Sequence, residues 1–166
     1  MSTMTNLFET LSQERAILLD ALKSLPDALL DRKGVVGEWS IKNVLAHLAG
    51  WEHVVTQFLP ERLARGIEPE ILSVMGADED AWNAQQVNSA ERFTPKEQLE
   101  EFERTRQALF QVLRDVGEEA LNRQHPWPEW EGTLATYIFE EIGGHEREHR
   151  EAVLTAVERL RGQSRP

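Results

Sequence analysis

Three histidines of this 166-residue chain have the residue type and spacing of metal ligands. His145 and His149 stand four residues apart, and His47 lies in a separate segment much earlier in the chain. Residues four apart on a helix lie on one face, one turn apart, so two imidazoles can reach one ion. The pattern predicts that His145 and His149 bind a divalent metal and that His47, on a second helix, supplies a third ligand.

The apolar residues around the C-terminal pair support this interpretation. With about 100° of rotation per residue, several apolar side chains fall on the same side of the helix as His145 and His149. These residues are Ile138, Ile142, Val153 and Ala156. Both histidines are therefore predicted to lie in the middle of an apolar stripe. The alternative is a pair of core histidines satisfied by hydrogen bonds, because most buried polar groups are paired within the protein.

His47 is predicted to lie at the edge of the apolar face of its helix, where a pocket could open to solvent. The apolar residues of that face are Val44, Leu48, Trp51 and Val55. His53 falls on the opposite side of the same helix and is expected at the surface. His125, beside Pro126, is expected at the surface or at the rim of a pocket.

The segment from His145 to His149 also fits H-E-x-x-H, the zinc-peptidase motif, in which Glu146 would be the general base. No later His or Glu stands at an obvious spacing for a third ligand, and no edge strand is predicted that could hold a peptide. Glu146 is placed on the rim of the apolar stripe, where an exposed glutamate is common. A peptidase is therefore the less favoured interpretation.

Composition excludes several classes of function. The chain has no cysteine, so it offers neither a disulfide framework nor a thiolate of its own, and any thiol chemistry would need a small-molecule thiol. Its formal net charge is -11, and no Lys/Arg cluster is present, so nucleic acids and anionic membranes are not expected as partners. No signal segment and no run of about 18 apolar residues is found, which predicts a cytoplasmic protein.

Hydrophobic periodicity predicts one all-α domain with four long helices, because no segment alternates as a half-buried strand would. Ser40 is predicted to cap the second helix, and Thr94-Pro95-Lys96-Glu97 to start the third. The predicted helices span 5–24, 41–59 or 41–65, 95–116 and 133–161. Residues 162–166 are expected to form a disordered tail.

Two connections are predicted in addition. Residues 65–94 are expected to form a long crossover between the second and third long helices, with a short helix of its own at 77–90. Pro126 and Pro128 flank Trp127, which predicts a rigid loop at 125–130.

The segment Trp39-Ser40-Ile41-Lys42-Asn43-Val44-Leu45-Ala46-His47-Leu48, followed by Trp51-Glu52, resembles the second-helix signature of the DinB-like proteins. The later pair, His145 and His149, completes that family's three-histidine pattern. The order and separation of these segments agree, so the resemblance covers essentially the whole chain. Trp51-Glu52 and Asp80-Ala81-Trp82-Asn83 look more like the ClbS/DfsB branch.

This resemblance implies a four-helix bundle in which the two middle helices run in the same direction, a connection that needs the long crossover. It implies a divalent metal, most often zinc or nickel, held by His47, His145 and His149 with coordination positions left open. It also implies a homodimer with a small-molecule substrate. Relatives include transferases and isomerases that use low-molecular-weight thiols, and a hydrolase that opens a strained ring.

Two functional classes follow. The first is a metal-dependent enzyme that acts on a small electrophile by thiol transfer or hydrolysis, with Glu52 and Glu146 as candidates to orient the ligands from outside the coordination sphere. The second is a non-catalytic protein that binds or sequesters a small toxic molecule, with a metal-stabilised fold. An apolar pocket is one interpretation of Trp51, Trp82, Trp127 and Trp130, and core packing is the other.

Overall fold

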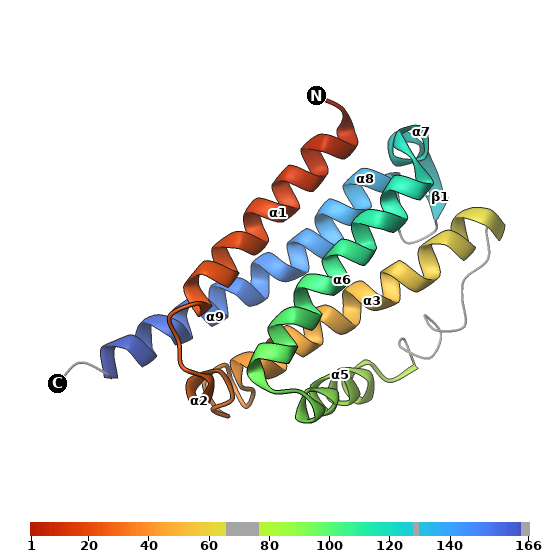
Figure 1. Cartoon of the computed structure of the whole chain (residues 1–166). Coiled ribbons are helices and arrows are strands. Elements are labelled where there is room, and N and C mark those ends of the chain that lie inside the picture. Colours follow the sequence, from red (N-terminus) through yellow and green to blue (C-terminus); the bar gives the residue numbers. More distant parts are fainter. Residues whose placement is uncertain (66–76, 128–129, 164–166) are drawn as a thin grey trace. The chain divides into compact units, whose positions relative to one another are not determined.

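The computed structural model describes residues 1–65, 77–127 and 130–163, and helices dominate this part of the chain (Figure 1). The four long helices predicted from the sequence are present, and the all-α prediction is confirmed except for one short hairpin. The four long helices are α1 (Thr3–Leu22), α3 (Ile41–Arg65), α6 (Pro95–Val116) and α9 (His145–Gln163). α9 continues two residues past the predicted helix end, and the rest of the predicted tail lies outside the described residues. No helix of the described part combines the length and the apolar character needed to cross a membrane.

The chain divides into two compact units. The first unit comprises Met1–Pro26 and Leu113–Pro166, and the second comprises Asp27–Val112, so that one boundary lies inside α6. The prediction of one domain over the whole chain is not tested by this division.

In the first unit, α1 packs along α9 (Figure 1). The buried side chains of both helices recur at helical spacing, as an apolar stripe requires. They are Leu7, Leu11, Leu18 and Leu22 on α1 and Val153, Ala156, Val157 and Leu160 on α9. The start of α1 is held by Glu118 of α7 (Glu118–Asn122), whose carboxylate accepts hydrogen bonds from the backbone N–H groups of Thr3 and Met4. A carboxylate is stabilising there because it satisfies N–H groups that have no partner within the helix.

In the second unit, α3 begins where the sequence predicts. The Ser40 hydroxyl accepts a hydrogen bond from the backbone N–H of Asn43, and the Asn43 side chain accepts one from the backbone N–H of Ser40. This reciprocal cap satisfies N–H groups that the first turn leaves open. Thr94 and Glu97 cap α6 in the same way. The remaining elements are α2 (Asp27–Leu30), α5 (Glu79–Ser89) and the 3₁₀ turn η1 (Ala90–Arg92).

The predicted crossover is described only in part. α5 and η1 confirm its short helix, which begins two residues later than predicted because Asp78 is its N-cap. Residues 66–76 lie outside the described part of the chain.

The prediction of a rigid loop at 125–130 is wrong where the structure describes this segment, because the described residues belong to strands. β1 (Gln124–Trp127) pairs antiparallel with β2 (Trp130–Thr133), and Pro126 stands opposite Glu131. The fixed backbone angle of proline is compatible with an extended strand, and a two-stranded hairpin has an edge on which the missing N–H is tolerated. Proline therefore restricted this backbone without preventing strand pairing.

The predicted helix at 133–161 is also not a uniform α-helix. Thr133 caps a single turn, α8 (Leu134–Tyr137), which continues as a π-helix, η2 (Ile138–Gly144), before α9 begins at His145. A π-helix has wider turns than an α-helix and is found frequently at functional sites. Here it ends immediately before His145, one of the candidate metal ligands.

Candidate metal centre

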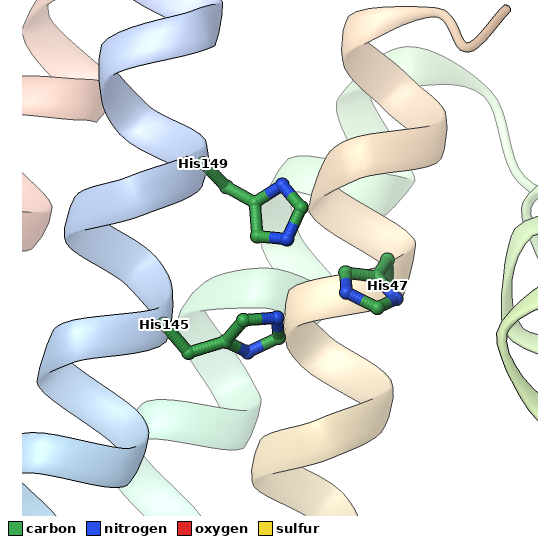
Figure 2. A group of neighbouring side chains, drawn as sticks. All are labelled: His47, His145 and His149. Carbon is green, nitrogen blue, oxygen red and sulfur yellow. The ribbon is translucent and has the colours of Figure 1, made fainter. Parts of the chain in front are cut away.

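His145 and His149 occupy the first turns of α9, and their rings project from the same side of the helix (Figure 2). The ring centroids are 4.7 Å apart with an interplanar angle of 81°. Both residues are half-buried, while Ile138, Ile142 and Val153 are fully buried. The two histidines are therefore less buried than the apolar residues predicted to share their side of the helix.

Two ion pairs attach this turn of α9 to α1. Arg15 and Glu146 are both buried, and Nη2 of Arg15 lies 2.7 Å from a carboxylate oxygen of Glu146. Arg147 pairs with Glu14 at 2.9 Å nearer the surface. Breaking a buried pair on one side leaves an uncompensated charge, which is strongly destabilising. The Arg15–Glu146 pair therefore fixes the backbone beside His145.

A glycine allows α1 to approach the end of the π-helix. A Cβ atom at Gly143 would lie 3.0 Å from Leu11 Cδ2, closer than such atoms ordinarily pack. Glycine within a helix is otherwise unfavourable by about 1 kcal/mol relative to alanine. The close contact with α1 gives Gly143 a packing role two residues before His145.

The position of Glu146 argues against the peptidase interpretation. A general base must reach a water molecule at the metal, but this carboxylate is buried and accepts hydrogen bonds from Nε and Nη2 of Arg15. A carboxylate held in this way by a guanidinium is not free to contact such a water molecule. Glu146 therefore has a structural partner, and its predicted influence on the orientation of a metal ligand stays a prediction.

The electrostatic setting keeps the C-terminal histidines neutral. The pKa of His145 is lowered from 6.5 to about 4, mainly by burial and in smaller part by the charge of His149. The charge of Glu146 opposes both effects. Burial also lowers the pKa of His149, against the opposing charge of Glu148. Neutral imidazole carries the lone pair that a metal needs. The donor set on α9 thus suits a divalent transition metal at neutral pH.

His47 lies on α3, and Figure 2 shows its ring beside that helix. It is only 3% exposed, so the prediction of a solvent-open edge is wrong. The physical reason is that the whole stretch 40–49 is buried, on both sides of the predicted apolar face. The His47 ring lies between two indoles, 5.1 Å from Trp39 and 6.4 Å from Trp51 between centroids. His53 on the same helix is exposed, as predicted.

Glu52 follows His47 on α3 and is also paired with arginine. It is 2% exposed, and its carboxylate accepts hydrogen bonds from the Thr105 hydroxyl, at 2.8 Å, and from Nε of Arg106 on α6. Glu52 therefore links α3 to α6 within the second unit. Its predicted role in orienting a metal ligand stays a prediction.

Arg15 and Arg106, the partners of the two buried glutamates, were not predicted from the sequence. Each occupies an apolar-stripe position: Arg15 follows Leu11 by four residues, and Arg106 follows Phe102 by four. A charged residue at such a position requires a partner in the core. That signal was available, but the identity of the partner was not.

The predicted tryptophan pocket is only partly described. Trp51 and Trp82 are half-buried. The side chains of Trp127, Trp130 and His125 lie outside the described part of the structure.

Comparison with protein families identifies the family of this chain. A family model described as the DinB superfamily matches residues 10–153, which include all three candidate ligands. No curated protein and no solved structure matches the chain. The match does not distinguish branches of the superfamily, so the ClbS/DfsB assignment stays a prediction.

We expect His145 of the metal-free protein to titrate with a pKa near 4, and His149 below the ordinary value of 6.5. As the pH is lowered, these histidines bind protons in the unfolded chain at a higher pH than in the folded protein. The free energy of unfolding should therefore fall as the pH drops from about 6.5 towards 4. NMR titration of the imidazole resonances measures the pKa values. His149→Ala should raise the pKa of His145 by removing a neighbouring positive charge, and an unshifted His145 pKa in the wild type would contradict the prediction.

Glu146→Gln should lower the free energy of unfolding by about 3–5 kcal/mol, because it leaves Arg15 buried without an opposite charge. Urea denaturation measures this change. Glu148→Gln is the matched control, since Glu148 is exposed on the same helix, and should change stability by no more than about 0.5 kcal/mol. Equal stability of both variants would show that the buried pair does not fix this turn.

Proposed function

Because the chain belongs to the DinB superfamily, we propose that His47, His145 and His149 hold one divalent metal ion and that the protein is a metal-dependent enzyme. Its substrate is a small electrophilic molecule, modified by thiol transfer or by hydrolysis. The proposal includes a cytoplasmic homodimer that binds neither nucleic acid nor membrane.

The donor set carries the proposal. The donors are His145 and His149, whose rings lie on one side of α9, and His47 on α3. Three imidazoles suit zinc or nickel, and three protein ligands leave positions for water or substrate, as in catalytic rather than structural zinc sites. The low pKa of His145 means that no proton has to be displaced from it at neutral pH.

A divalent ion with open coordination positions supplies Lewis acidity, which lowers the pKa of a bound water or thiol and polarises an electrophile. The chain's own residues hold the ligand rings and limit access of water, with Trp39 and Trp51 flanking His47. The chain has no cysteine, so a thiol has to come from a low-molecular-weight cosubstrate.

The second candidate is a non-catalytic protein that binds or sequesters a small molecule, with the metal stabilising the fold. One observation favours it. Glu52 and Glu146, the two carboxylates predicted to orient the ligands, both accept hydrogen bonds from buried arginines and are poorly placed to act as bases. The same observation favours thiol transfer over hydrolysis within the first candidate, because a coordinated thiol loses its proton readily without a neighbouring base.

Protein prepared without a histidine tag and reloaded with zinc or nickel should contain one ion per chain by elemental analysis. His47→Ala, His145→Ala and His149→Ala should each weaken binding by at least about 100-fold, more than the loss of a residue outside the coordination sphere. His53→Ala is the control, because His53 is an exposed histidine on α3, and it should bind like the wild type. Full retention of the ion by any of the three variants would remove that residue from the site.

The metal-loaded protein should consume model electrophiles in the presence of low-molecular-weight thiols, at a rate that falls to background in His47→Ala and in metal-free protein. Product formation across a panel of thiols and epoxides, measured by mass spectrometry, tests this expectation. Thermal stabilisation by a panel compound without any product would favour the binding protein over the enzyme.

A further inference from the structure

α5 lies on α3 with the side chain of Gln86 placed over Gly50 of α3 (Figure 1). A Cβ atom at Gly50 would lie 2.4 Å from Oε1 and 2.8 Å from Cδ of Gln86, because the Gln86 side chain crosses the α3 backbone at this point. Real Cβ atoms do not approach other atoms so closely, so any larger residue would displace the Gln86 side chain. Gly50 is one turn after His47. The contact between the helices therefore lies next to a proposed metal ligand.

Polar contacts complete this attachment. The Trp51 indole N–H donates to Oδ1 of Asn83 at 3.2 Å, and the Asn43 amide donates to the backbone carbonyl of Val87 at 3.4 Å. No side chain of α5 is fully buried. A helix with so little apolar burial depends on specific hydrogen bonds for its position. Asn83 is the α5 residue that bonds to a side chain touching His47.

Trp51 is the intermediate between Asn83 and His47. Its indole meets the His47 ring edge to face, with centroids 6.4 Å apart and an interplanar angle of 75°. This is a favourable geometry for two aromatic rings. The hydrogen bond to Asn83 sets the rotation of the indole, and the indole in turn limits the rotation of the buried imidazole. The orientation of a ligand ring, in addition to its position, determines whether its lone pair points at the ion.

We propose that Asn83 is a positioning residue for metal binding, acting through Trp51 on the ring of His47. This inference rests on the proposed role of His47 as a ligand. It assigns to α5, a helix without a ligand of its own, control over the geometry of the metal centre.

The test uses cobalt(II) as the probe ion, added to chelator-treated full-length protein. Asn83→Ala should weaken cobalt(II) binding by about tenfold and change the visible absorption spectrum, which reports coordination geometry. Asn88→Ala is the matched control, because Asn88 is an exposed asparagine on the same helix and the same side-chain atoms are removed. It should leave affinity and spectrum unchanged.

A second variant separates positioning from loss of structure. Trp51→Phe keeps an aromatic ring but removes the indole N–H, and should reproduce the effect of Asn83→Ala. Since both act through one hydrogen bond, the double variant should be no weaker than either single variant. Additive losses, or wild-type affinity and spectrum in Asn83→Ala, would overturn the proposal.

Failure of the proposed function would be recognised separately, because the wild type itself would then bind no cobalt(II). In that case, NMR spectra of the metal-free protein test whether Asn83 affects the His47 ring. Asn83→Ala should shift the Trp51 indole N–H resonance and the His47 ring resonances, whereas Asn88→Ala should not. Unmoved His47 resonances would overturn the coupling between Asn83 and the imidazole.

Discussion

The helices that carry the candidate ligands are fixed by buried arginine–glutamate pairs. Glu146, next to His145 on α9, pairs with Arg15 of α1, and Glu52, on the same helix as His47, pairs with Arg106 of α6. Burying such a pair is costly, and apolar residues of the same size often give equal or greater stability. A charged pair in the core is instead specific, because only one alignment of the two helices satisfies both partners. We interpret the two pairs as constraints on helix register near the histidines.

This constraint explains why the glutamates do not act as the sequence motif suggests. H-E-x-x-H at His145 places Glu146 as a catalytic base, yet its carboxylate is paired with Arg15. The same five residues thus hold two ligand candidates and one structural anchor. The spacing of residues defines which side chains share a helix face, whereas the function of a carboxylate depends on what is packed against it.

Local departures from regular structure occur close to the candidate ligands. The π-helix ends one residue before His145, Gly143 admits Leu11 of α1, and Gly50 admits Gln86 of α5 one turn after His47. Each departure weakens the helix taken alone, through a wider turn or a flexible backbone. Each also permits a close contact that a regular helix with larger side chains would exclude. Their positions are consistent with the need to orient ring nitrogens and not merely to bury apolar surface.

The sequence by itself determined the four long helices, their caps at Ser40 and Thr94, and the candidate ligands, because periodicity, capping and ligand spacing are local properties. Only the tertiary structure identified the arginine partners of Glu52 and Glu146, the hairpin at Pro126 and the bond from Trp51 to Asn83. These features join residues that are distant in sequence, or they depend on the pairing of one segment with another. The residue pattern of a single segment contains no information on such contacts. The burial of His47 was hidden for the same reason: the side of a helix that neighbouring elements cover is decided by packing, not by the helix itself.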